Sequence, residues 1–182
     1  MKNHLINFKD IKFYDYKFED IIKVLEKSGG VLVAPAASAL VNIHSDPEYY
    51  KALKKSDVAI LDSGFFCILW RIFKNQRLRK FSGYLFLKKL ILFISGKDIK
   101  VLTIDPTSED AKINKKFLLE KGLKKIASYV APIYKKNCII DNKLLKIIKT
   151  EKPKYIIINL GGQTQEILGV YIKENINLKL NI

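Results

Sequence analysis

Apolar residues recur along the chain in two alternating patterns, one typical of amphipathic helices and the other typical of buried strands. In residues 18–27 (FEDIIKVLEK) the apolar side chains fall on one helical face, and Gly29-Gly30 ends the helix. Residues 31–33 (VLV) then form a short apolar run before Pro35, as expected for a buried strand that leads into a loop. This opening pattern predicts a helix followed by the first strand of a sheet.

The same alternation continues through the rest of the chain. The signal Ser45-Asp46-Pro47-Glu48 combines a capping side chain, a proline and an acid, and it marks a helix start. We expect further helices at residues 47–55, 65–73, 84–95, 108–121, 142–150 and 164–174. We expect further strands at residues 58–61, 99–104, 126–130 and 155–160, and residues 178–182 look like the start of another. Strands that alternate with helices specify a mostly parallel sheet covered on both faces, so we predict a Rossmann-like α/β fold, with one domain over residues 1–182.

The chain carries a strong positive charge. Its 33 Lys and Arg residues exceed its 18 Asp and Glu residues, and the net charge of +15 attracts polyanions and anionic membranes. A solvated, Lys-rich face that reflects an AT-rich coding sequence explains the charge equally well. The sequence has no RNP-like aromatic strand, helix-turn-helix spacing or zinc knuckle, so we expect no nucleic-acid partner.

The sequence contains neither a secretion signal nor a spanning segment. Residues 1–18 lack the apolar core and cleavage site of a signal peptide, so we expect the chain in the cytoplasm. The longest apolar stretch, residues 59–73, contains Asp62 and Arg71 and is shorter than the ~20 apolar residues of a spanning helix. This stretch is predicted to be a buried or interfacial helix.

The cysteines and histidines form no metal-binding pattern. Cys67 and Cys138 lie far apart among apolar neighbours, with no His near either of them at ligand spacing. His4 and His44 are isolated as well. We therefore expect two buried thiols, no metal site and no cofactor.

In a parallel sheet, ligands bind beyond the carboxyl ends of the strands, which here are the loops after Val33, Leu61, Ile104 and Leu160. The second of these loops begins with Asp62, followed by Ser63 and Gly64. A carboxylate fixed at a strand end can act as a general base. An Asp before an apolar helix is also a common N-cap, and spacing alone favours the cap.

Two further segments have chemistry suited to phosphate. The run Gly161-Gly162-Gln163-Thr164-Gln165-Glu166 places glycines before a helix start, where free N–H groups can hold phosphate. An ordinary strand-to-helix turn has the same composition, and the run is not a known phosphate-binding motif. Arg77, Arg79 and Lys80 form a basic cluster that could contact diphosphate oxygens or simply be a solvated loop.

Three stretches follow the order of motifs in a known family. Residues 33–64 (VAPAASALVNIHSDPEYYKALKKSDVAILDSG), 79–83 (RKFSG) and 159–166 (NLGGQTQE) carry them. These stretches resemble motifs of the WecG/TagA/CpsF glycosyltransferases. The first stretch resembles the family's TPN loop, D-P-E-like signal and P-D-G element. The second resembles its R-x-x-G segment, and the third resembles its G-x-G-x-P-K-Q-E motif. The resemblance covers about residues 20–175 and rests on order and spacing more than on identity.

The resemblance implies roles for individual residues. The family's catalytic aspartate falls on Asp62, and the glutamine of its late motif falls on Gln165. The substrate-binding residues that it implies are Ser38, Arg79, Lys80, Gly161, Gly162, Gln163, Gln165 and Glu166.

The chain also departs from the family pattern. Ala34 and Ala36 replace the threonine and asparagine of the TPN loop, and Lys80 stands at the position of the R-x-x-G arginine. Leu85 replaces an aspartate, and Asp105 puts an acid where a nucleotide would lie against glycine backbone. These departures place the substrate contacts in question.

The resemblance implies an inverting, metal-independent glycosyltransferase of cell-surface polysaccharide synthesis. It would move an N-acetylhexosamine-type sugar from a UDP-sugar to a polyprenyl-diphosphate-linked acceptor, at an anionic membrane surface on the inner face of the cell membrane. A catalytically degenerate relative that serves as a binding or assembly subunit is the alternative, and self-association is left open.

Overall fold

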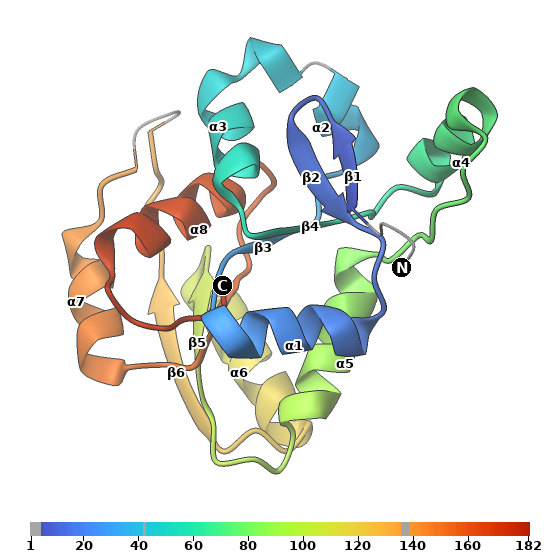
Figure 1. Cartoon of the computed structure of the whole chain (residues 1–182). Helices are drawn as coiled ribbons and strands as arrows, with labels where there is room; N and C mark the ends of the chain where they lie inside the picture. Colours follow the sequence, from blue (N-terminus) through green and yellow to red (C-terminus); the bar gives the residue numbers. More distant parts are fainter. Residues whose placement is uncertain (1–4, 42, 136–138) are drawn as a thin grey trace.

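The computed structural model describes residues 5–41, 43–135 and 139–182. Helices cover both faces of mostly parallel sheets, which confirms the predicted α/β, Rossmann-like fold class (Figure 1). The strands are β1 (Leu5–Phe8), β2 (Ile11–Tyr14), β3 (Leu32–Val33), β4 (Val58–Ile60), β5 (Lys100–Asp105), β6 (Lys125–Val130) and β7 (Tyr155–Ile158). The helices are α1 (Phe18–Ser28), α2 (Ala37–Val41), the 3-10 helix η1 (Ile43–Ser45), α3 (Pro47–Lys55), α4 (Gly64–Lys74), α5 (Gly83–Ile94), α6 (Ser108–Glu120), α7 (Asn142–Glu151) and α8 (Thr164–Asn175).

The strands form two sheets, of order β1-β2-β4-β3 and β6-β5-β7. Only the pairing of β1 with β2 is antiparallel among these strands. The C-terminal residues join the sheets, because Asn181 forms parallel bridges both to Gly30, beside β3, and to Tyr155 in β7. Backbone hydrogen bonds of 2.7 to 3.1 Å accompany these bridges. The strand expected over residues 178–182 is therefore a short segment that makes the two sheets continuous.

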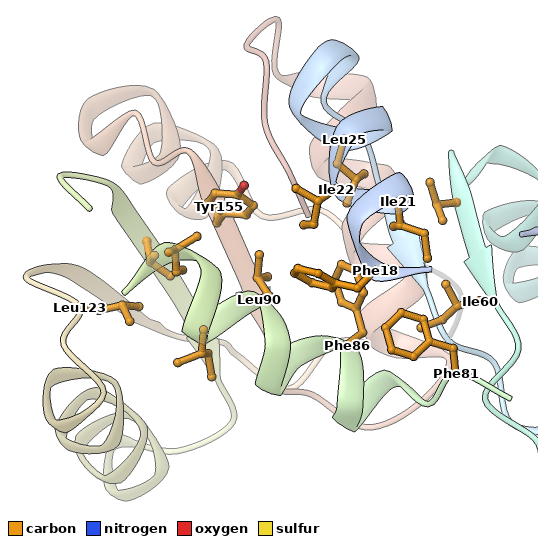
Figure 2. Close-up of a cluster of buried hydrophobic side chains, with 14 of the residues drawn as sticks. Phe18, Ile21, Ile22, Leu25, Ile60, Phe81, Phe86, Leu90, Leu123 and Tyr155 are labelled. Carbon is orange, nitrogen blue, oxygen red and sulfur yellow. The ribbon is translucent and has the colours of Figure 1, made fainter. Parts of the chain in front are cut away.

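The hydrophobic core has clusters on both faces of the sheet. Figure 2 shows the cluster in which α1 and α5 pack on the sheet, with the rings of Phe18 and Phe86 centred 5.5 Å apart. Ile60 in β4 faces this cluster, whereas its neighbours Ala59 and Leu61 face the opposite cluster, which contains residues of α3. The alternation along β4 is the period of two that a strand imposes on its side chains.

Local sequence signals determine where the helices start. Helix α3 begins at Pro47 as predicted, and the Asp46 side chain accepts a hydrogen bond of 3.0 Å from the N–H of Tyr49. Thr107 and Asp141 cap α6 and α7 in the same way. Each cap satisfies an N–H group that the helix itself leaves without a partner.

The N-terminal hairpin of β1 and β2 was not predicted from the sequence. Its turn residues, Lys9 and Asp10, have φ angles of 49° and 59°, a conformation that hairpin turns usually assign to Asn and Gly. Helix α2 was not predicted either. Within the described ranges, no helix is long and apolar enough to cross a membrane.

Candidate functional site

A cavity of about 540 Å³ opens where the two halves of the sheet meet. Its walls are the carboxyl-terminal end of β3, the end of β7 and the inner face of α5, and it reaches the C-terminal residues. The first half of the chain extends the sheet outward from β3 and the second half extends it from β7, so this is the switch point at which open α/β sheets bind ligands. The cavity also has the size of a typical small-molecule site.

Asp62 lies at the wall of this cavity, two residues after the end of β4. Its Oδ1 accepts a hydrogen bond of 3.1 Å from the N–H of Gly83, the first residue of α5. The first N–H of α5 therefore holds one oxygen of the carboxylate in place. Spacing alone favoured Asp62 as the N-cap of the next helix, and this expectation is wrong. Ser63 caps α4 instead, since its hydroxyl accepts from the N–H of Phe66 at 3.1 Å.

The contact between Asp62 and α5 depends on a close approach between the first turn of α5 and the residues that follow β3. A Cβ atom at Gly83 would lie 3.0 Å from the Cβ of Ala34, which follows β3. A larger residue at either position would push the first turn of α5 away from the sheet. The glycine of the RKFSG stretch thus brings an N–H donor to Asp62, and Ser82 caps α5 immediately before it by accepting from Leu85 N–H at 3.2 Å.

Glu166 faces the same cavity from α8 and is only 5% exposed. Its Oε1 accepts a hydrogen bond of 3.2 Å from Gln165 Nε2. Burial raises the pKa of the Glu166 carboxyl, while Gln165 and the backbone N–H groups of Glu166 and Gln163 act in the opposite direction. Burial, and then the charge of Glu166, also raise the pKa of Tyr49 on α3. The site therefore has two carboxyl groups in different surroundings.

Unpartnered oxygen atoms gather around the cavity. Among the described residues, the buried side-chain atoms without a protein hydrogen-bond partner are Asp105 Oδ2, Glu166 Oε2 and Asn181 Oδ1. Glu166 and Asn181 line the cavity, and Asp105 is linked to it through Asn159, another lining residue. Buried acceptors are almost always paired, so the two unpartnered oxygens of lining residues, on Glu166 and Asn181, indicate a place where a ligand or water donates hydrogen bonds.

Asp105 is turned into the protein. It is fully buried, and its Oδ1 accepts hydrogen bonds of 2.7 Å from the amides of both Asn114 and Asn159. The loop after Ile104 was expected to border the ligand site together with three others, but Asp105 lines neither the main cavity nor the adjacent one. The acid expected to face a nucleotide instead orients the amide of Asn159.

A second cavity, of about 490 Å³, adjoins the first and shares Ala34, Gln165 and Glu166 with it. Ser38, Ala36, Gly162 and Gln163 are also among its lining residues. Gln163, the N-cap residue of α8, has a strained φ of 73°, and its side chain makes no cap hydrogen bond.

The turn before α8 contains two glycines that the fold does not require. A Cβ at Gly161 or Gly162 would meet no atom within 4 Å, and neither residue has a left-handed φ. Gly162 lines the second cavity, while Gly161 is exposed and lines neither cavity. Small residues at these positions leave room for a ligand near the start of α8.

The basic cluster lies outside both cavities. Arg79 and Lys80 are exposed, and the backbone N–H of Arg79 donates to Asp15 Oδ1 at 3.0 Å. The Lys80 side chain passes Gly64, where a Cβ would lie 3.4 Å from Lys80 Cδ. These two residues thus stand beside the Asp62 loop, on the side of α4.

The other titratable candidates offer no competing site. Cys67 is buried as expected, and burial raises the pKa of its thiol. His44 is exposed against the ring of Tyr50, and His4 and Cys138 lie outside the described residues. Among described residues, no three His, Cys, Asp or Glu side chains are grouped to hold a metal ion.

The structure thus brings Asp62, Gln165 and Glu166 to one cavity and places Ser38, Gly162 and Gln163 at the adjoining one. Sequence reasoning missed the lining residues Asn159 and Asn181. Asn159 directly follows β7, a position at a strand end that could have identified it. Asn181 had no such signal, because its place depends on pairing with distant strands.

Comparison with known proteins agrees with this geometry. A family model described as the WecG/TagA/CpsF glycosyl transferase family matches residues 6–182. The match includes β3, β7, α5 and α8, and therefore every wall of the cavity. No curated protein matches the chain. The match over nearly the whole chain confirms the resemblance seen in the sequence motifs, and the chain belongs to the WecG/TagA/CpsF family of glycosyltransferases.

Proposed function

We propose that this chain is an inverting, metal-independent glycosyltransferase that moves an N-acetylhexosamine-type sugar from a UDP-sugar to a polyprenyl-diphosphate-linked acceptor. The family accounts for glycosyl transfer in cell-surface polysaccharide synthesis. The observation that carries the finer proposal is the grouping of Asp62, Glu166 and unpartnered acceptors at one cavity of about 540 Å³. Hydroxyl and N–H groups of a nucleotide sugar would supply the donors that these acceptors lack.

Asp62 is proposed as the general base. Its Oδ1 is held by Gly83 N–H, which leaves Oδ2 for an acceptor hydroxyl. Asp62 would take the proton as the hydroxyl oxygen bonds to the anomeric carbon. The bond between that carbon and the UDP oxygen breaks, and UDP leaves with the electron pair from the opposite face. A fixed carboxylate at hydrogen-bond distance is what such a proton transfer requires.

The diphosphate is proposed to lie between the starts of α5 and α8. Both helices have 12 residues, and the side chain of Gln163, the N-cap residue of α8, makes no cap hydrogen bond. The N-terminus of a helix favours negative charge and offers N–H donors to phosphate oxygens. Gly161 and Gly162 keep the approach to α8 open, and Arg79 and Lys80 would add positive charge at the rim.

The substitution Asp62→Asn tests the proposal. Loss of the base should lower sugar transfer by roughly 10² to 10⁴-fold, measured as UDP release with acceptor present. Binding of UDP and the thermal unfolding temperature should stay near wild type, because the amide keeps an oxygen for Gly83 N–H. The exposed Asp98, substituted by Asn, is the control and should leave transfer unchanged. Unchanged turnover in Asp62→Asn would remove Asp62 from the mechanism.

A second candidate function is that of a catalytically degenerate binding or assembly subunit. It is favoured by Ala34 and Ala36, whose methyl groups line the second cavity where the family places hydrogen-bonding side chains. Calorimetric titration of UDP and UDP-sugars separates the two candidates. Binding of UDP supports the transferase, and the absence of heat with UDP and with UDP-sugars supports the subunit.

A further inference from the structure

Helix α4 is apolar on two opposite faces. Its inner face packs on the N-terminal hairpin, where the Phe66 ring lies 5.0 Å from that of Phe8 and 5.9 Å from that of Phe13. Cys67 and Trp70 belong to the same core cluster. This inner face accounts for the attachment of α4 and leaves its other apolar side chains unexplained.

The outer face of α4 is an uncovered apolar stripe. Phe65, Ile68, Ile72 and Phe73 are 65%, 59%, 68% and 77% exposed. Together with the half-buried Leu69 they follow the i, i+3, i+4, i+7, i+8 spacing of one helical face. Figure 1 shows α4 projecting from the body of the protein beyond β1 and β2. Apolar side chains grouped in this way mark an interaction surface.

Positive charge surrounds this apolar stripe. Arg71 and Lys74 lie in the last turn of α4, and Arg77, Arg79 and Lys80 follow in the loop that leads to α5. The sequence contains no Asp or Glu from Ser63 to Lys97. An apolar face bordered by Lys and Arg is typical of helices that lie in the interface of an anionic bilayer.

The stripe is also close to the site along the chain. Asp62 precedes α4 by two residues, and Ser63 is the N-cap of the helix. The start of α4 is therefore fixed next to the proposed base, while its basic end points away along the helix. A surface bound to this stripe would lie close to the mouth of the site.

We propose that the outer face of α4 docks on an anionic lipid bilayer, with the apolar stripe among the acyl chains and the basic loop on lipid phosphates. The helix has 11 residues, too few for the ~20 that span a bilayer, so it would lie in the plane of the interface. Delivery of a lipid-linked acceptor to Asp62 rests on the proposed function, whereas the docking does not.

Charge favours the bilayer over a second copy of the chain as the occupant. A two-fold contact between two α4 stripes would bring Arg71, Lys74 and Arg77 of both copies together without an acid nearby in the sequence to offset them. Anionic headgroups complement the same residues.

Vesicle flotation tests the docking. The wild-type chain should float with vesicles of equal parts phosphatidylglycerol and phosphatidylcholine. The double variant Ile68→Glu, Ile72→Glu should lower the bound fraction at least about tenfold, because it buries charge in place of two apolar side chains. The matched control is Ile113→Glu with Leu119→Glu, at positions on α6 that are 65% and 49% exposed, and it should float like wild type.

A charge-reversal pair provides a second measurement if the apolar variant fails to fold. Lys74→Glu with Arg77→Glu should lower binding to the anionic vesicles and leave the weaker binding to pure phosphatidylcholine vesicles unchanged. Lys112→Glu with Lys115→Glu on α6 makes the same change in net charge at exposed positions and should have a smaller effect.

Three results would overturn the docking. The first is that the wild-type chain does not bind the anionic vesicles. The second is that the α4 variants float as the wild type does. The third is that the α4 variants change only the oligomeric state without lipid, from oligomer to monomer, in sedimentation velocity. The last result would assign the stripe to self-association.

Failure of the proposed function can be distinguished from failure of the docking. Asp62→Asn should float with the vesicles as the wild type does, while its sugar transfer is lost. The α4 variants should likewise transfer sugar to a water-soluble acceptor and lose transfer to an acceptor embedded in vesicles.

Discussion

The two carboxyl groups at the cavity occupy opposite surroundings. Asp62 is half-buried at the end of β4 and accepts a hydrogen bond from the N-terminus of α5. Glu166 is 5% exposed, has one oxygen without a partner, and has a pKa raised by burial. A backbone N–H holds one oxygen of the Asp62 carboxylate, whereas burial opposes negative charge on Glu166. The proposed division of roles, with Asp62 as the base and Glu166 as a substrate-binding group, can be tested on this contrast.

The largest expected effect separates these two roles by mutation. Asp62→Asn should lower kcat by roughly 10² to 10⁴-fold with little change in KM, because only the transition state uses the base. Glu166→Gln keeps the shape of the side chain and should lower kcat/KM by about tenfold, mainly through KM, as expected for one altered hydrogen bond of about 1.5 kcal/mol. Steady-state kinetics with UDP-sugar and acceptor measures both variants.

The exposed Glu109 at the start of α6 provides a matched control, since Glu109→Gln should behave as wild type. Equal losses of kcat in Asp62→Asn and Glu166→Gln would contradict the division of roles.

The fold was largely predictable because its signals are local. Helix α3 has the bounds that its cap and proline predict, and α1, α7 and α8 begin where expected. Strands β4 and β7 end earlier than their apolar runs, at Ile60 and Ile158, because Leu61 is buried in the core and Leu160 lines the cavity without pairing as strand residues. The N-terminal hairpin was missed because its turn, Lys9-Asp10, lacks the glycine that normally signals a left-handed turn.

The site was less predictable because its geometry depends on contacts between distant residues. The sequence pointed to Asp62 but not to its partner, the N–H of Gly83, 21 residues away. The inward turn of Asp105 depends on Asn159, which lies 54 residues away. Spacing along the chain cannot show which way a side chain at a strand end points.

A smaller effect is expected from the contact that supports Asp62. Gly83→Ala would place a Cβ 3.0 Å from that of Ala34, so α5 must shift and its N–H must move from Asp62. We expect a loss of roughly 1 to 3 kcal/mol in the free energy of unfolding, typical of overpacking, together with reduced turnover. Urea unfolding and transfer assays measure the two losses.

The control for Gly83 is Gly161→Ala, where the added methyl meets no protein atom. This variant should unfold like wild type, because no protein atom has to move to admit the methyl. A wild-type unfolding curve for Gly83→Ala would show that α5 does not hold Asp62 by close packing.

The smallest effect concerns the burial of Glu166 and its dependence on pH. The pKa of Glu166 is higher in the folded chain than its ordinary value of 4.5. Between these two pKa values the folded chain binds more protons than the unfolded chain. The contribution of Glu166 to the free energy of unfolding therefore falls as pH rises from 4.5. Glu166→Gln cannot titrate and should gain thermal stability relative to wild type as pH increases from 4.5, by about 1.4 kcal/mol for each unit by which the pKa is raised. Unfolding temperatures of both proteins across this pH range measure the gain. If the unfolding temperatures of the two proteins stay a constant distance apart across this pH range, Glu166 ionises as easily in the cavity as in water. The contrast between Glu166 and Asp62 would then rest on their positions alone.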